Sequence, residues 1–392
     1  MPVPLIALFV AAFAFGTTEF VIAGVLPQVA EGLGVSIPDA GYLVSGYALG
    51  IAIGGPFVTL ATARLRRKTL LLGLLVAFTL GQIACALAPD FTSMLLLRIV
   101  IAVAHGTYFG VAMVVAVGLV PEERRSMAVA VVLAGLTISN VVGVPLGTAI
   151  GNMFDWRATF WAMFVLGILA VVAVATLLPA RTGAARPAGF FDEVRALGRQ
   201  QIWTSLIIML MLMMAQFVPL TYIAPYLTEV TGLDEGAVPW VLLANGVGAT
   251  IGVFVGGRLS DWHLMPSLIT LLVLQAVVLV TMYLVSPYAL PMIVVVMLWG
   301  ALNFAIGTPV QARILEWTRD APNLAASLIP SGFNLGIAIA ASIGAIMLNG
   351  GLGYRALPLV GVASMAVALL VAIASYMHER RSGQRPPVAK PA

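Results

Sequence analysis

Long apolar runs without charged residues dominate this chain. One of them, "FWAMFVLGILAVVAVATLL" (160–178), has the length of a helix that crosses a bilayer, about 20 residues. Only 9% of the 392 residues are charged, whereas soluble domains carry about 25%. The runs also lack the alternation of apolar and polar residues that a transmembrane β-strand requires. We therefore predict α-helices that span a membrane.

Charged residues divide the chain into twelve apolar segments with short connections. We predict spans near residues 4–28, 40–62, 69–88, 93–118, 127–150, 158–178, 202–227, 237–257, 267–285, 290–311, 325–348 and 356–377. The predicted fold is an all-α polytopic membrane protein with twelve transmembrane helices in two pseudo-symmetric six-helix bundles.

The distribution of basic residues predicts the orientation, because cytoplasmic loops are enriched in Lys and Arg. With the first residue inside, every Lys and Arg except Arg98, Arg157 and Arg355 falls in an inner loop or the tail. An odd number of spans would destroy this bias. We expect a multi-pass protein with both termini in the cytoplasm. The net charge of +4 reflects the bias and does not indicate a nucleic-acid partner.

A polar, basic break divides the spans six and six. It predicts an N-terminal bundle over 1–178, a cytoplasmic linker over 179–201 and a C-terminal bundle over 202–378, followed by a disordered cytoplasmic tail over 379–392. Within the linker, an amphipathic surface helix is expected from Phe190 onward.

The two halves show traces of a repeat. "FVIAGVLPQVAEGL" (20–33) is similar to "TYIAPYLTEVTGL" (221–233). In the second and eighth spans, Gly50 aligns with Gly248 and Gly54 with Gly252. Repeated halves are typical of secondary transporters, whose substrate site lies between the repeats.

The loop after the second span, "TLATARLRRK", resembles the loop signature of the major facilitator superfamily, and the resemblance extends over the whole chain. Ala63 stands where that family has Asp, and after the eighth span "GRLSDW" keeps the acidic residue. The resemblance implies a gating role for a set of loop residues, although the basic cluster has the alternative role of setting topology: Arg64, Arg67, Lys68 and Asp261.

A Gly- and Pro-rich stretch in the fifth span resembles the antiporter signature of drug exporters in that superfamily. It contains Gly143, Pro145 and Gly147, which also suit close helix packing and a kink. "GTTEFVIAGVLPQVA", "AHGTYFGVA" and "WRATFW" resemble bacterial sugar and arabinose efflux permeases, and chloramphenicol exporters look similar. The resemblance implies export across a bacterial inner membrane.

Three ionisable residues fall well inside the spans: Glu19, Arg98 and His105. A charge at the bilayer centre costs about 2.5–3.5 kcal/mol, so such residues usually serve function. Glu19 and Arg98 lie at similar predicted depth and can pair if the first and fourth spans face each other. We predict that Glu19 carries the proton, that Arg98 modulates it and that His105, two turns along, relays it. A static ion pair and a packing histidine are the alternatives.

Neutral polar side chains are the remaining candidates inside the spans. They suit a cavity for uncharged amphipathic solutes or sugars and do not suit phosphate, which would require several arginines. Some of them are instead expected to form interhelical hydrogen bonds. The predicted cavity set is Tyr47, Tyr108, Asn140, Gln216, Tyr222, Asn245, Asn303 and Asn334.

The sequence contains no nucleotide-binding motif, metal cluster or nucleophile motif, so we expect no enzyme, no metal and no cofactor. We predict a secondary active transporter that acts as one chain and exports a sugar or a chloramphenicol-like drug, driven by the proton gradient. Proton-coupled uptake and an uncoupled facilitator or channel remain the alternatives.

Overall fold

The computed structural model describes residues 3–62, 64–121, 124–179, 197–319 and 322–383, and these ranges contain helices and no strand. Eleven helical segments within them are long and apolar enough to cross a membrane. One of these, α14 (Val238–Val285), holds two spans, because its backbone is extended at His263 (φ −150°, ψ 90°). The fold is therefore all-α with twelve spans, as predicted. The amphipathic helix expected from Phe190 lies outside the described residues.

The N-terminal half forms six spans, several of them built from consecutive short helices. Its helices are α1 (Val3–Phe20), α2 (Leu26–Leu33), α3 (Ile37–Ala40), α4 (Tyr42–Leu49), α5 (Gly55–Ala61), α6 (Arg67–Ala86), α7 (Phe91–Gly118), α8 (Arg125–Ile138), α9 (Val144–Met153) and α10 (Trp156–Leu177).

The C-terminal half repeats this plan with longer unbroken helices. Besides α14, its helices are α12 (Gln200–Thr221), α13 (Ile223–Pro225), α15 (Ala289–Trp317), α16 (Pro322–Asn349) and α17 (Leu357–Ser382).

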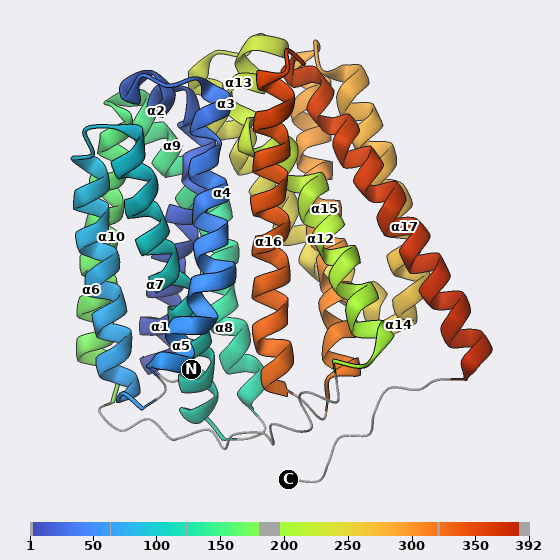
Figure 1. The fold of residues 1–392 in the computed structure, drawn as a ribbon, viewed down its shortest axis with the longest axis horizontal. Helices are drawn as coiled ribbons and strands as arrows, with labels where there is room; N and C mark the ends of the chain where they lie inside the picture. Colours follow the sequence, from blue (N-terminus) through green and yellow to red (C-terminus); the bar gives the residue numbers. More distant parts are fainter. Residues whose placement is uncertain (1–2, 63, 122–123, 180–196, 320–321, 384–392) are drawn as a thin grey trace.

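The two halves stand side by side, with the helices up to α10 in one bundle and those from α12 onward in the other (Figure 1). Helix α1 begins and α17 ends at the same end of the molecule, which we call the terminal end; the opposite end is the distal end. Along the seam, α16 packs against α4, and α14 packs against α9.

Two spans of the N-terminal half contain a widened π-helical turn immediately before a proline. Residues Gly50–Gly54 precede Pro56, and residues Ser139–Gly143 precede Pro145. Proline lacks the N–H that an α-helix uses, and a π turn is one way to accommodate the missing bond. Pro145 therefore reshapes the fifth span without ending it.

The glycines of the fifth span form the face that contacts the first span. A Cβ built on Gly147 would lie 2.6 Å from Val21 Cγ2, and Gly143 faces Thr17 in the same way. Small residues at this spacing let two helix backbones approach closely in a membrane.

The glycines that align between the two halves make equivalent helix contacts in each half. Gly50 packs against Ile99 and Ala102 of α7, whereas Gly248 packs against Met297 of α15. Both glycines join the second span of their half to the fourth. The local similarity in sequence therefore reflects a shared helix contact.

Three predicted boundaries differ from the structure. The first span ends at Gly24, where the 3₁₀ turn Val21–Gly24 that follows α1 leads into a separate α2. The seventh span likewise ends at Thr221, because Pro219 and Pro225 lie near its end and each lacks an N–H. Helix α17 continues to Ser382, beyond the tail boundary predicted at residue 379.

We expect Gly135→Ala to destabilise the N-terminal bundle. A Cβ at residue 135 would lie 2.6 Å from the backbone oxygen of Phe9 and 2.8 Å from Ala12 Cβ, and backbone cannot move aside as a side chain can. Overpacking of this kind costs about 1–3 kcal/mol. Thermal melting followed by size-exclusion chromatography measures the effect. Gly73→Ala is the matched control, since no atom lies within 4 Å of its Cβ position; an equal melting temperature for both variants would contradict the prediction.

Candidate functional site

Helices α1, α4 and α7 bring four polar side chains together inside the N-terminal half: Glu19, Tyr47, Arg98 and His105. The Tyr47 hydroxyl lies 3.0 Å from His105 Nδ1, and His105 Nε2 lies 3.9 Å from Glu19 Oε2. The Arg98 guanidinium sits over the Tyr47 ring, 4.6 Å from its centroid. We call these four residues the polar cluster.

Aromatic rings hold His105 in place within the polar cluster. Phe15 stacks on the imidazole at a centroid distance of 4.9 Å, and Phe109 packs at 5.1 Å. The Tyr108 hydroxyl donates to the backbone oxygen of Leu8. Tyr108 is therefore part of the packing around the cluster.

Glu19 and Arg98 lie in the same interior but contact other groups instead of forming the predicted pair. Within the described residues the structure shows no ion pair between them, because Glu19 turns to His105 and Arg98 turns to Tyr47 and donates from Nε to the Leu43 oxygen at 3.3 Å. Both side chains can form further hydrogen bonds, since Glu19 Oε1 and both Arg98 Nη atoms are buried without a partner among the described residues. Unpaired groups of this kind are costly in a dry interior, so Glu19 and Arg98 are candidates for contacts with water or a solute.

A small cavity lies on the seam between the halves, next to the polar cluster. Glu19, 8% exposed, and Tyr47 contribute its polar lining from the N-terminal half. The rest of the lining comes from both halves: Phe20, Ile22, Ala23, Val44, Ala48, Phe217, Leu220, Thr221 and Ile337. Glu19 thus faces the histidine on one side and the seam on the other.

Of the eight residues predicted for the cavity, Tyr47 alone lines it. Asn140, Asn245 and Asn334 donate their amide N–H to backbone oxygens within or between helices. Gln216 and Asn303 are buried and each retains an oxygen without a partner. The sequence missed the apolar lining, because an apolar residue that faces a cavity has the same composition signal as one that faces lipid.

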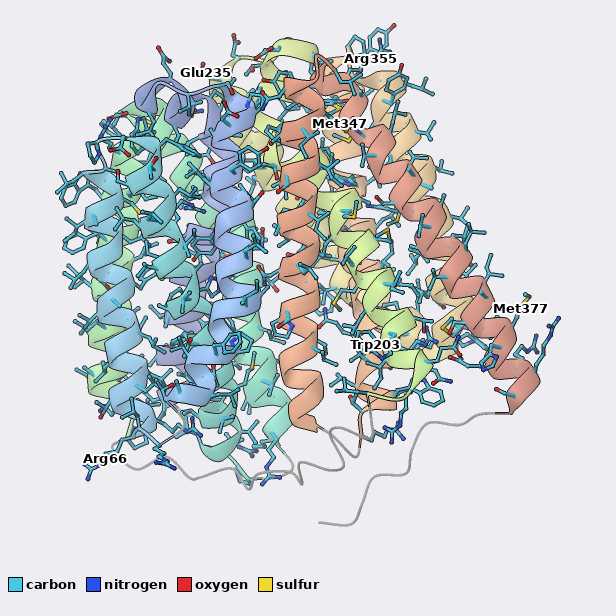
Figure 2. The ribbon with its side chains drawn as sticks, viewed as in Figure 1. Arg66, Trp203, Glu235, Met347, Arg355 and Met377 are labelled. Atoms are coloured by element: carbon cyan, nitrogen blue, oxygen red, sulfur yellow. The ribbon has the colours of Figure 1, made fainter. Side chains whose placement is uncertain are left out.

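Tyr222 joins the two halves near the distal end. Its hydroxyl lies 3.0 Å from the Ala341 oxygen and 3.4 Å from the Pro38 oxygen, one in each half. Further bonds cross the seam at this end, where Figure 2 places Glu235: Asn152 Nδ2 donates to the Glu235 oxygen at 2.8 Å, and Asn349 Nδ2 donates to Asp39 Oδ1 at 3.1 Å. The described residues therefore hold the halves together at the distal end.

The predicted gating loops are not joined to each other in the described residues. Lys68 Nζ donates to the backbone oxygens of Ala175 and Leu178, at 2.7 and 2.5 Å, and so fixes α6 to the end of α10. Arg64 and Asp261 are exposed. In the described part of the chain no ion pair is seen for Arg64, Arg67 or Asp261.

We expect Gly246→Ala to open the seam toward the distal end. Its Cβ would lie 2.6 Å from the Asn140 oxygen and 2.7 Å from Val141 Cα, which belong to the other half. The cost of about 1–3 kcal/mol falls only on conformations in which the halves touch here. Spin labels attached to cysteines at the exposed positions Glu31 and Gly236, in a Cys85→Ala background, measure the separation of the two halves. Double electron–electron resonance should give a longer distance between the labels in Gly246→Ala than in the unaltered protein.

Gly257→Ala is the control for this experiment, because nothing lies within 4 Å of its Cβ position although it shares α14 with Gly246. An unchanged distance distribution in Gly246→Ala would show that the seam tolerates the added methyl group.

Twelve spans in two halves, with ionisable side chains buried beside the seam, define a polytopic membrane protein of the transporter class. The family model of the Major Facilitator Superfamily matches residues 8–316 and, in a second placement, residues 206–392. The chain belongs to this superfamily and is a multi-pass membrane transporter. The resemblance seen in the sequence is confirmed.

Relatives align over nearly the full chain. The inner membrane transport protein YdhP of Escherichia coli strain K12 is 36% identical over 372 residues, with 95% of each chain covered. The chloramphenicol resistance protein of Streptomyces lividans is 33% identical over 375 residues, covering 95% of this chain and 96% of that protein. A bacterial homolog of the human lysosomal transporter Spinster shares the fold, with a TM-score of 0.78, 17% identity and 96% coverage of both chains.

Proposed function

We propose that this transporter is a proton-coupled exporter of a small neutral or amphipathic solute. One observation carries the proposal: the carboxyl group of Glu19 lines the cavity on the seam, while its other face touches the polar cluster. A carboxyl group in such a place can take up a proton on one side of the membrane and release it on the other when the halves rearrange.

The neighbours of Glu19 suit proton exchange. His105 lies 3.9 Å from one carboxylate oxygen and is itself bonded to Tyr47. Arg98 supplies a positive charge in the same interior without being tied to Glu19 in an ion pair. Glu19 therefore can accept a proton without first breaking an ion pair with Arg98, and His105 offers a route for the proton within the cluster.

The lining of the cavity favours an amphipathic solute. Phe20, Phe217, Leu220 and Ile337 supply apolar and aromatic surface, and Tyr47 and Thr221 supply hydroxyl groups. Binding sites of this composition suit drug-like molecules better than sugars, which need many hydrogen-bond partners. The relationship to a chloramphenicol resistance protein supports the same class.

We place the terminal end of the molecule in the cytoplasm of a bacterial cell. Arg66 lies at that end in Figure 2, with most other basic residues of the loops. The relative in Escherichia coli is an inner membrane protein, which supports the same membrane here. One chain contains both halves and the seam, so a monomer is sufficient for transport.

Everted membrane vesicles with an imposed pH gradient test the proposal. We expect radiolabelled chloramphenicol to accumulate when the interior is acidic, and the accumulation to collapse when the gradient is dissipated. Arabinose is the second probe and tests the sugar alternative. Equilibration without accumulation would indicate a facilitator, and accumulation with the gradient reversed would indicate uptake; either result contradicts the proposal.

A further inference from the structure

Gln82 is a buried amide to which the proposed proton chemistry assigns no part. Its side chain in α6 is 0% exposed, and neither Nε2 nor Oε1 has a hydrogen-bond partner among the described residues. Buried polar groups without partners are rare in proteins, and each one calls for an explanation such as bound water.

The helix neighbours of Gln82 place it on the side of α6 that faces α1. Phe78, one turn earlier on the same face of α6, packs against Phe15 at a centroid distance of 4.4 Å, and Phe15 stacks on His105. Glu19 follows Phe15 by one turn, just as Gln82 follows Phe78. Since α1 and α6 both run from the terminal end (Figure 1), one turn beyond the Phe15–Phe78 contact brings the two helices to a similar depth at Glu19 and Gln82.

Arg98 reaches this depth from α7, which runs in the opposite direction. A Cβ built on Gly81 would lie 2.5 Å from Ile101 Cγ1, so these two positions face each other. One turn toward the distal end from this contact, α6 presents Cys85 and α7 presents Arg98. Gln82 and Cys85 follow Phe78 and Gly81 by one turn each, so Gln82 lies on the side of α6 that faces Phe15 of α1 and Ile101 of α7.

The unpaired atoms of Arg98, Glu19 and Gln82 are complementary. Arg98 offers donors at Nη1 and Nη2, Glu19 offers an acceptor at Oε1, and Gln82 offers one acceptor and one donor. We propose that Gln82 is a positioning residue that binds water and connects the Arg98 guanidinium to the Glu19 carboxyl group through hydrogen bonds.

An amide suits this position because it accepts at one atom and donates at the other without a charge of its own. Oε1 accepts from the arginine side, and Nε2 donates to the carboxylate side. The proton of a protonated Glu19 is then donated to the bound water. The titratable groups that surround this water are Glu19 from α1, Tyr47 from α4, Cys85 from α6, and Arg98 and His105 from α7.

The C-terminal half contains a matched control. Gln275, in the second helix of α14, is also 0% exposed, and in the part of the chain that the structure describes it also lacks a partner at both Nε2 and Oε1. It lies in the other half, away from Glu19. Gln275→Leu removes a similar buried amide without touching the polar cluster.

Radiolytic footprinting of the full chain in lipid nanodiscs tests the water site. Hydroxyl radicals formed from bound water oxidise adjacent side chains, even buried ones. We expect Cys85 and Phe78 to be oxidised in the unaltered protein, and their oxidation rate to fall about tenfold in Gln82→Leu, as for the loss of a hydrogen bond to a charged group. Gln275→Leu should leave both rates unchanged. Gln82→Met provides a second apolar variant if Gln82→Leu folds poorly.

Protection of Cys85 and Phe78 in the unaltered protein would overturn the proposal, as would equal oxidation in Gln82→Leu. This measurement uses no solute and no gradient, so its outcome is independent of whether chloramphenicol is transported. A role of Gln82 in proton coupling rests on the proposed function and is measured separately. Chloramphenicol-dependent proton release from everted vesicles should fall about tenfold in Gln82→Leu and recover in Gln82→Asn. A proton signal that Gln82→Leu leaves unchanged would remove Gln82 from coupling.

Discussion

Glu19→Gln is expected to abolish transport driven by a pH gradient while the protein remains folded in the membrane. The amide has nearly the shape of the carboxyl group and can still bond within the polar cluster, but it cannot take up or release a proton. Accumulation of radiolabelled chloramphenicol in everted vesicles should fall to the level of vesicles without the protein. Because His105 is the one ion-pair partner of Glu19 among the described residues, at 3.9 Å, the loss of its charge should cost little stability.

Glu31→Gln is the matched control for this experiment. Glu31 is another carboxylate of the N-terminal half, exposed at the distal end in α2, and its neutralisation should leave transport unchanged. Normal accumulation in Glu19→Gln at equal protein level would exclude Glu19 as the proton carrier, and reduced accumulation in both variants would indicate a general charge effect.

The fold could be predicted from the sequence because one physical constraint dominates it. A helix must be apolar over about 20 residues to span a bilayer, so scarce charges mark the loops. The break at His263 illustrates this: polar residues near it separated the eighth span from the ninth, and the backbone there is extended. The helix ends at Phe20 and Thr221 are not predicted, because the apolar run continues past both; prolines lie near Thr221 only.

The candidate site could be predicted only in part. Glu19, Arg98 and His105 stood out because ionisable residues are rare in spans, but their partners follow from helix packing that no local pattern encodes. The contact of the Arg98 guanidinium with the Tyr47 ring, for example, depends on how α4 packs against α7. Gln82 gave no signal at all, since a single amide in a span is common and its meaning depends on what faces it.

The contact between Arg313 and Glu379 is another feature that the sequence does not reveal. The sequence predicts Arg313 in an inner loop and Glu379 in the tail, because charged residues usually lie outside the membrane. In the structure Arg313 is 1% exposed within α15, and its Nη2 lies 2.5 Å from Glu379 Oε1 in α17. Two charges that pair can be accommodated where one could not, so the helices continue past the apolar run.

Glu379→Ala is therefore expected to destabilise the C-terminal half strongly. Arg313 Nη2 also donates to Ser375 Oγ at 2.6 Å, but its Nε and Nη1 atoms have no partner, so Glu379 supplies the only compensating charge among the described residues. Removing one partner of a buried pair costs about 3–5 kcal/mol, and the 17% exposure of the Glu379 side chain favours the lower end. Thermal melting in detergent should show a clear drop in the unfolding temperature.

The double variant Arg313→Met with Glu379→Ala distinguishes a buried unpaired charge from lost packing. Without the guanidinium no charge remains to be compensated, so the double variant should regain most of the stability that Glu379→Ala loses, since apolar replacement of a buried pair is often neutral or better. Glu316→Ala is the control, because the Glu316–Arg319 pair is exposed, with side-chain exposures of 40% and 49%, and such pairs contribute about 0–1 kcal/mol. If Glu379→Ala melts at the same temperature as Glu316→Ala, the Arg313 charge must be compensated by another group, and the Arg313–Glu379 contact does not stabilise the C-terminal half.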